Sequence, residues 1–211
     1  MQTDAMIEKL SGLGVIPVIS LENADDADPL ADALVAGGLP VAEVVFRTAS
    51  AEDSIRALAA RDDLLVGAGT VLTPEQADRA QAAGAEFALS PGINPTVVRH
   101  CLEIGLPIFP GVSTPSEIER ALELGLSTVK FFPAEALGGV ATLKAIAAPY
   151  KDVRFIPTGG IDAGNLSDYL ALECVIACGG SWIVKSSLIS AGEFSQIEQL
   201  AREAVKLAQA V

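Results

Sequence analysis

The sequence predicts an α/β fold, a single-domain (β/α)8 TIM barrel over residues 1–211 with an extra N-terminal helix. Half of the residues are hydrophobic and 19% are charged, which is typical of strands covered by helices on both faces. Glycines that precede predicted strands mark a repeat of about 20 to 23 residues. An open doubly wound sheet is the main alternative, but it would lack this near-uniform repeat. The marking glycines are Gly38, Gly84, Gly105 and Gly125.

Eight short runs of largely apolar, β-prone residues are the predicted strands. Because they alternate with helical segments, we expect them to pair in parallel around one barrel. They are Val15–Ser20, Val41–Phe46, Leu64–Gly69, Phe87–Ser90, Pro107–Pro110, Thr128–Phe132, Arg154–Pro157 and Val175–Cys178.

Start signals mark the helices between these strands. Thr73 and Thr114 are each followed by proline and, three positions on, by Gln76 or Glu117, which predicts capping boxes. Glycine near the end of a helix permits a left-handed cap. The predicted helices cover residues 3–11, 24–36, 51–61, 74–83, 95–104, 115–124, 140–148 and 193–209, with a weaker one at Asn165–Leu172.

Charge and composition exclude several classes of function. The net charge is −13 and the pI is near 4.4, which opposes non-specific binding to nucleic acid or anionic membranes. No apolar stretch approaches the length of a membrane-spanning helix. Met1–Leu10 carries Asp4 and Glu8 where a secretory signal would be basic, so we expect a cytoplasmic protein.

The metal-binding residue types are scarce. Cys101, Cys174 and Cys178 lack the spacing of metal ligands and are expected to pack as small apolar side chains. The single histidine, His100, lies in a predicted helix and is expected to serve the surface or packing. We therefore expect neither a metal site nor histidine-based catalysis.

Lys130 stands in an apolar run, Val129–Pro133, in a chain with six lysines. Period-2 alternation places Lys130 on one strand face with Thr128 and Phe132. Loss of hydration there favours the neutral amine, which can attack a carbonyl carbon and form a Schiff base. The alternative is a structural lysine whose stem is buried and whose ammonium group reaches water.

A carboxylate and a guanidinium share one face of the second predicted strand. Glu43, Val45 and Arg47 alternate along the face expected to point inward. Opposite charges in a core are costly unless they pair or take part in chemistry, so an internal salt bridge is the structural alternative. With Lys130, they would supply an amine nucleophile, a proton-transferring carboxylate and a guanidinium that grips a substrate carboxylate.

Further candidates follow the ends of other strands, where the functional residues of a barrel gather. Thr70 has a hydroxyl suited to a carboxylate site, and Pro91 lies in a tight turn that brings backbone near a ligand. Paired glycines occur in Thr158–Gly160 and Gly179–Ser181. Loops after strands seven and eight recur as phosphate sites, because exposed backbone N–H groups bind anions. The alternative is that these glycines only permit close packing.

Five segments resemble the 2-keto-3-deoxy-6-phosphogluconate (KDPG) aldolases, a family that includes bifunctional KDPG/4-hydroxy-2-oxoglutarate aldolases. They occur in family order from the second predicted strand to the eighth, and thus cover nearly the whole chain. The Lys-Phe-Phe-Pro-Ala-Glu segment is highly specific. The segments are Gly38–Arg47, Val66–Leu72, Val129–Glu135, Pro157–Gly160 and Gly179–Trp182.

The resemblance implies a metal-free class I aldolase without a cofactor. It would cleave KDPG to pyruvate and glyceraldehyde 3-phosphate in the Entner–Doudoroff pathway of carbohydrate metabolism, as a homotrimer of barrels. Lys130 is implied as the Schiff-base lysine, Glu43 as the general acid and base, and Arg47 with Thr70 as contacts for the pyruvyl carboxylate. The candidate substrate-binding residues are Arg47, Thr70, Pro91, Phe132, Thr158, Gly159, Gly160, Gly180 and Ser181.

Two positions depart from the family pattern. Val45 stands where the family usually has threonine, which puts the hydrogen bonding between Glu43 and Arg47 in question. Lys185 stands where proline is common, near the phosphate end of the expected site, and so bears on substrate preference.

Other functions fit parts of the pattern. The same site would also suit 4-hydroxy-2-oxoglutarate or 2-keto-3-deoxy-6-phosphogalactonate, because these substrates share the pyruvyl half. A phosphosugar isomerase or epimerase on the same barrel often needs metal ligands or paired acid and base groups, which the single His100 disfavours. A non-catalytic phosphometabolite-binding protein would use Lys130 only as an anion contact.

Overall fold

The computed structural model describes residues 2–211, and its strands form two parallel sheets. The larger sheet has the order β5-β4-β3-β2-β1-β9, and the smaller has the order β6-β7-β8. The strands are β1 (Val15–Ile19), β2 (Val41–Val45), β3 (Leu65–Gly69), β4 (Phe87–Leu89), β5 (Ile108–Phe109), β6 (Gly111–Val112), β7 (Thr128–Phe131), β8 (Arg154–Pro157) and β9 (Cys178–Gly180).

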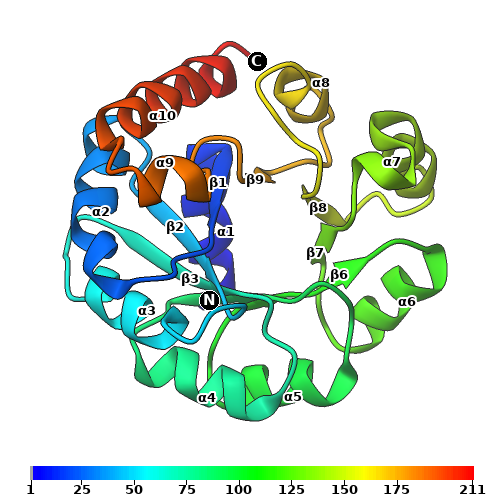
Figure 1. Cartoon of the computed structure of the whole chain (residues 1–211). Coiled ribbons are helices and arrows are strands. Elements are labelled where there is room, and N and C mark those ends of the chain that lie inside the picture. Colours follow the sequence, from blue (N-terminus) through cyan, green and yellow to red (C-terminus); the bar gives the residue numbers. More distant parts are fainter. Residues whose placement is uncertain (1) are drawn as a thin grey trace.

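Two connections join the sheets into one curled arrangement. The fifth predicted strand, Pro107–Pro110, is present as β5, and β6, which was not predicted, follows directly after Pro110. Proline separates the two because it has no N–H to donate to a ladder. Its carbonyl still accepts the N–H of Lys130 at 2.9 Å. At the other side, isolated parallel bridges link Phe155 with Val175 and Thr158 with Gly179. The α/β class and the parallel curled sheet are thus confirmed (Figure 1).

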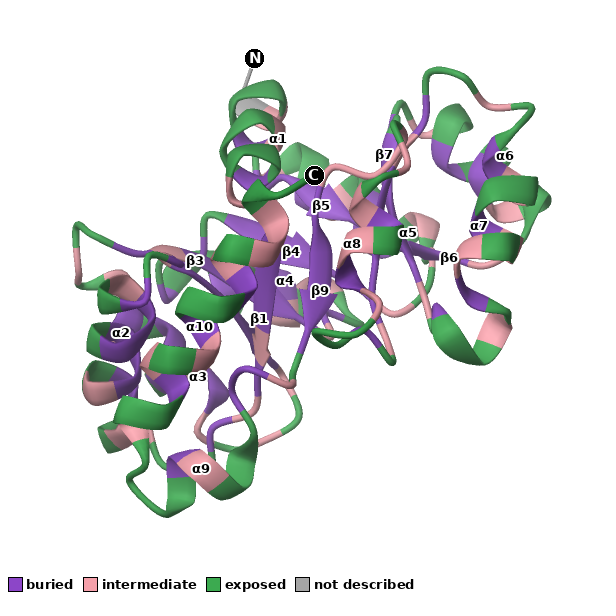
Figure 2. Ribbon diagram, turned by 90° about the horizontal axis from the view of Figure 1, so that it is seen from above, coloured by how far each residue is buried: buried purple, intermediate pink, exposed green. Residues whose placement is uncertain are grey.

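Helices surround the strands, and two of them lie at opposite ends of the arrangement (Figure 2). One is α1, which precedes β1, and the other is α9, a short helix that the sequence did not predict. The helices are α1 (Gln2–Leu13), α2 (Ala27–Ala36), α3 (Ala51–Ala59), α4 (Pro74–Ala82), α5 (Pro95–Glu103), α6 (Pro115–Glu123), α7 (Gly139–Ala147), α8 (Leu166–Leu170), α9 (Ser186–Ser190) and α10 (Phe194–Gln209). Short 3-10 turns, η1 (Ala24–Asp26) and η2 (Glu135–Leu137), complete the set.

The predicted helix ends are present. Gly38, Gly84, Gly105 and Gly125 all have positive φ, between 75° and 101°, as left-handed caps require. The capping box at Thr114 is complete. At Thr73 only half of it forms, because the side chain of Gln76 accepts the N–H of Leu72 instead.

The predicted start of the last strand is wrong by three residues and its predicted end by two. β9 covers Cys178–Gly180, whereas the prediction was Val175–Cys178. Glycines have low strand propensity, but here Ile16 and Pro17 of β1 pair with Gly179 and Gly180 and carry them into the sheet. The shift places the glycines inside the strand rather than in the loop that follows it.

The interior is apolar with a marked exception. Glu43 and Lys130 are the charged side chains that are buried in the described part of the chain. Cys101 and Cys178 are buried among apolar side chains as predicted, and Cys174 is half-buried. Over residues 2–211, no helix is both long and apolar enough to cross a membrane.

Candidate active site

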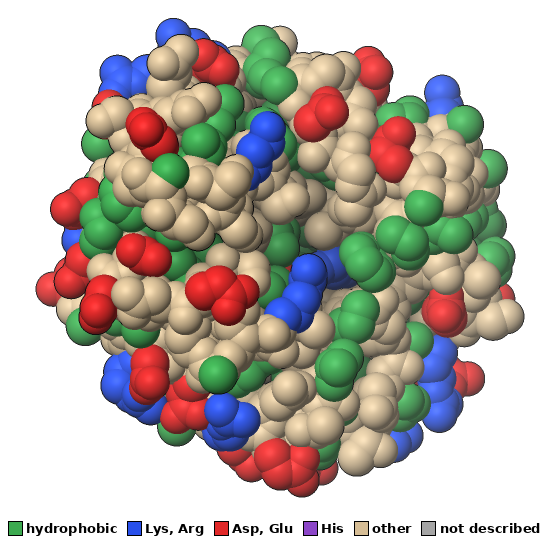
Figure 3. Space-filling model, in the orientation of Figure 1, with side chains coloured by type: hydrophobic (Ala, Val, Ile, Leu, Met, Phe, Trp, Pro, Cys, Tyr) green, Lys and Arg blue, Asp and Glu red, His purple; other side chains and the backbone are tan. Residues whose placement is uncertain are grey.

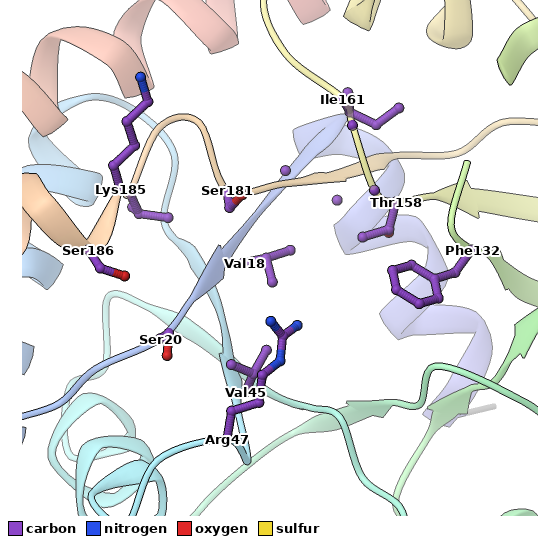
Figure 4. A pocket seen from close by; sticks show the side chains of 15 residues that line it. Val18, Ser20, Val45, Arg47, Phe132, Thr158, Ile161, Ser181, Lys185 and Ser186 are labelled. Carbon is purple, nitrogen blue, oxygen red and sulfur yellow. The ribbon is translucent and has the colours of Figure 1, made fainter. Parts of the chain in front are cut away.

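A cavity of about 480 Å³ opens where β1, β2, β8 and β9 end. Lysine or arginine side chains lie at the central hollow of this face, whereas acidic side chains are scattered around it (Figure 3). In Figure 4 the side chains of Arg47 and Phe132 point into the cavity from different walls. The walls consist of Val18, Ser20, Val45, Arg47, Phe132, Thr158, Gly159, Gly160, Ile161, Gly179, Gly180, Ser181, Val184, Lys185 and Ser186.

Lys130 and Glu43 meet inside the curled sheet, from strands of the two different sheets. Lys130 Nζ lies 3.4 Å from Glu43 Oε1, and both side chains are almost fully shielded from solvent. The ammonium group also lies 5.3 Å from the centre of the Phe132 ring. The predicted inward face of each strand is confirmed, and the distance allows direct proton transfer between the two groups.

The two carboxylate oxygens of Glu43 differ, because Oε1 accepts a hydrogen bond from Lys130 and Oε2 does not. Its Oε2 is buried and has no hydrogen-bond partner within the described residues. A buried carboxylate oxygen without a partner is costly and rare, and such groups concentrate where chemistry needs them. The free oxygen is therefore available to a substrate hydroxyl or a water molecule.

Gly69 makes room for this carboxylate. A Cβ added at Gly69 would lie 2.3 Å from Glu43 Oε1 and 2.8 Å from Val45 Cγ1. Such distances are far below van der Waals contact, so the absence of a side chain on β3 sets the position of the Glu43 side chain.

Gly69→Ala is expected to lower kcat by roughly 10- to 100-fold, because the carboxylate must move away from Lys130. Overpacking should also cost about 1–3 kcal/mol of stability. Steady-state kinetics and thermal unfolding measure both effects. Gly12→Ala in α1 is the control, since an added Cβ there meets nothing within 4 Å. Unchanged kinetics in Gly69→Ala would contradict this account of the site.

Arg47, which lines the cavity, and Thr70, which it contacts, form a second polar group. Arg47 Nε donates to Thr70 Oγ1 at 3.4 Å, so the predicted neighbours lie together. Thr70 has a φ of 58°, and among residues 2–211 it is the one non-glycine residue with a positive φ. A β-branched residue in this region is strained by about 1–3 kcal/mol, and such strain clusters at functional sites.

The glycine-rich loops form the opposite side of the cavity. Thr158, Gly159 and Gly160 follow β8, and Gly180 with Ser181 ends the neighbouring strand β9. An added Cβ at Gly179 would lie 2.4 Å from Thr158 Oγ1. The Thr158 side chain thus fills the space that a side chain at Gly179 of β9 would occupy, which explains glycine at this position.

Four of the predicted site residues are absent from the cavity lining, namely Lys130, Glu43, Thr70 and Pro91. Pro91 is absent from the lining, and its carbonyl oxygen faces Gly111, where an added Cβ would lie 2.1 Å away. Val45 lines the cavity as an apolar side chain, so it gives Glu43 no hydrogen bond. His100 belongs to α5 and is absent from the lining too; its Nε2 lies 2.7 Å from Asp78 Oδ1 at the surface.

Several lining residues were not predicted. Val18 and Ser20 come from the end of β1, whose sequence carries no charged or glycine signal. Ser186 and Val184 come from the segment around α9, which was not predicted. Lys185 lies at the rim with its amine directed away from Arg47 (Figure 4).

Metal-binding residues do not gather at this site or elsewhere in residues 2–211, where no three His, Cys, Asp or Glu side chains cluster as ligands. The donors that do gather are an amine, a carboxylate and a guanidinium. Such a set can form an imine with a keto acid and move its protons.

Comparison with known proteins adds the family. A family model described as KDPG and KHG aldolase matches residues 6–200. The chain is 54% identical over 203 residues to a 2-dehydro-3-deoxy-phosphogluconate aldolase of Treponema pallidum, covering 96% of this chain and 97% of the relative.

Two solved structures share the fold and much of the sequence. The 2-keto-3-deoxy-6-phosphogluconate aldolase of Zymomonas mobilis with 3-phosphoglycerate matches with TM-score 0.89 and 40% identity over 94% of each chain. The KDPG aldolase of Legionella pneumophila, with pyruvate captured as a covalent carbinolamine intermediate, matches with TM-score 0.88 and 43% identity, covering 90% of this chain and 93% of that one.

Proposed function

The chain belongs to the KDPG and KHG aldolase family, and on this basis we propose that it is a class I aldolase that cleaves KDPG to pyruvate and glyceraldehyde 3-phosphate. The observation that carries the proposal is the buried pair of Lys130 and Glu43, 3.4 Å apart beside a cavity that also holds Arg47. The covalent carbinolamine captured in the Legionella relative supports the Schiff-base route.

The reaction begins at the ketone of the substrate. The neutral amine of Lys130 attacks C2 and forms a carbinolamine, whose hydroxyl leaves as water once it has received a proton. Glu43 moves these protons, directly or through water, and its unpartnered Oε2 is free to do so. The product is a protonated imine between Lys130 and the keto acid.

Cleavage then uses the imine as an electron sink. Glu43 takes the proton of the C4 hydroxyl, the C3–C4 bond breaks, and its electron pair moves into the imine to give an enamine. Glyceraldehyde 3-phosphate leaves. Protonation of the enamine at C3 and hydrolysis of the imine release pyruvate and restore the amine.

The remaining residues hold the substrate in place. Arg47, with the hydroxyl of Thr70 beside it, binds the pyruvyl carboxylate, and Phe132 packs against the keto acid. We assign the phosphate to the side of Thr158, Gly159, Gly160, Gly180 and Ser181, and retain Pro91 as a candidate contact. Their place opposite Arg47 in the cavity supports this division.

The fold and assembly follow the same proposal. A closed (β/α)8 barrel of one domain is supported by the isolated bridges Phe155–Val175 and Thr158–Gly179 and by the continuity of β5 with β6. A homotrimer and a cytoplasmic location are proposed as well. The family resemblance supports the trimer, and three free cysteines are typical of a reducing compartment.

Borohydride reduction with pyruvate tests the proposed chemistry. We expect an irreversible adduct of one pyruvate-derived group, because borohydride reduces the imine to a stable secondary amine. Peptide mass mapping should place it on Lys130. An adduct on another lysine, or none, would overturn the mechanism and leave the isomerase or binding-protein alternatives. Cleavage rates for KDPG, 2-keto-3-deoxy-6-phosphogalactonate and 4-hydroxy-2-oxoglutarate then rank the substrates.

A further inference from the structure

The Thr158–Ile161 segment forms one wall of the cavity without regular secondary structure of its own. All four residues line the cavity. Gly159 and Gly160 have φ of 101° and 81°, so the backbone adopts a shape open to glycine and rarely to other residues. A wall of this kind keeps its shape only where neighbouring elements hold it.

The loop after β7 holds this wall from one side. The N–H of Ala134 donates to the carbonyl of Thr158 at 2.8 Å, and the N–H of Glu135 donates to that of Gly159 at 3.0 Å. Gly160 rests on the stem of Glu135, since an added Cβ would lie 2.6 Å from Glu135 Cβ. The position of Glu135 therefore sets the backbone at the two glycines.

Helix α8 in turn holds Glu135. The Tyr169 hydroxyl donates to Glu135 Oε1 at 2.5 Å. Tyr169 is fully buried, and its burial, followed by the nearby carboxylate, raises the pKa of the phenol, which keeps its proton for this bond. At the N-terminal end of α8, Asn165 donates its side-chain N–H to the Gly160 carbonyl at 3.0 Å.

We propose that Tyr169 and Glu135 are a positioning pair that holds the Thr158–Ile161 backbone in the shape that binds the phosphorylated end of the substrate. This inference rests on the proposed function, because it assigns the phosphate half of KDPG to this wall. Neither side chain lines the cavity. Both act through the backbone of Gly159 and Gly160, and leave the pyruvyl half at Lys130 and Arg47 untouched.

Tyr169→Phe and Glu135→Ala test the pair, because each removes the hydrogen bond and keeps the catalytic side chains. We expect KM for KDPG to rise about tenfold in both variants, because the loss of one hydrogen bond to a charged group weakens binding by about that factor. Since distal binding alone is weakened, kcat should stay within about twofold. The pyruvate concentration for half-maximal borohydride trapping should not change.

Two further variants separate positioning from general destabilisation. Glu135→Gln should restore KM to near the wild-type value, because an amide oxygen still accepts the phenolic O–H. Tyr150→Phe is the matched control: the chain has two tyrosines, and the Tyr150 hydroxyl bonds Pro115 and Glu119 away from this cavity. Its kinetics should match those of the wild type. The double variant Tyr169→Phe/Glu135→Ala should be no worse than either single one.

The outcomes distinguish this inference from the proposed function. A wild-type protein that forms no pyruvate adduct would refute the function. Normal trapping with an unchanged KM in Tyr169→Phe and Glu135→Ala would refute the positioning pair alone. A fall in kcat matched by an equal fall in pyruvate trapping would also refute it, because the effect would then not be confined to the phosphate half. If Tyr169→Phe does not fold, the comparison of Glu135→Ala with Glu135→Gln decides, because that side chain is largely exposed.

Discussion

We expect Lys130→Met to abolish aldol cleavage. Turnover should fall by roughly 10⁴-fold or more, because the loss of a covalent nucleophile has effects of this size in other enzymes. Methionine matches the length of the lysine stem and suits a buried apolar site. KDPG cleavage, followed by pyruvate formation, measures the loss. Borohydride and pyruvate should leave this variant without an adduct.

The fold should survive the same substitution. Removal of Lys130 leaves the buried carboxylate of Glu43 without its partner, which typically costs about 3–5 kcal/mol, less than the stability of roughly 5–15 kcal/mol that native domains have. Circular dichroism and thermal unfolding measure the change. Lys144→Met, at an exposed position on α7, is the matched control and should retain full activity. Turnover above about 1% of wild type in Lys130→Met would contradict the assigned nucleophile.

Glu43→Gln has the second-largest expected effect. The amide keeps the shape of the side chain but cannot take a proton from the C4 hydroxyl, so kcat should fall about 10²- to 10⁴-fold. The imine should still form, because the amine of Lys130 remains. Steady-state cleavage of KDPG measures kcat, and borohydride trapping measures how much imine forms.

Proton exchange gives an independent measure of the same step. Pyruvate bound as an enamine exchanges its methyl protons with deuterated solvent, and Glu43→Gln should slow this exchange as much as cleavage. Glu103→Gln, on the exposed side of α5, should match the wild type in both. Exchange and cleavage at wild-type rates in Glu43→Gln would exclude Glu43 as the general acid and base.

Local patterns predicted most of the fold. The strand around Lys130, predicted as Thr128–Phe132, is present as β7 at Thr128–Phe131, because apolar alternation is a property of neighbouring residues. Local sequence signals failed where pairing with a neighbouring strand determines the position of a strand. Gly179 and Gly180 belong to β9 only because β1 lies alongside them, and no propensity of glycine indicates that.

The site divides in the same way. Residue type and alternation pointed to Lys130, Glu43 and Arg47, and the family resemblance supplied their roles. Ser20 and Val18 line the cavity without any distinguishing signal in their own strand. The support that Tyr169 gives Glu135 also had no signal, because a buried tyrosine in a weak helix is ordinary.

The sequence by itself determined the candidates for chemistry, the strand faces that they occupy and the ends of most helices, because these depend on residues close together in the chain. Only the tertiary structure decided which side chains meet. Lys130 and Glu43 stand 87 positions apart and touch because the sheet curls, and Gly69 sets the carboxylate by leaving a space. Contacts of this kind arise from the curl of the sheet, which no local periodicity encodes.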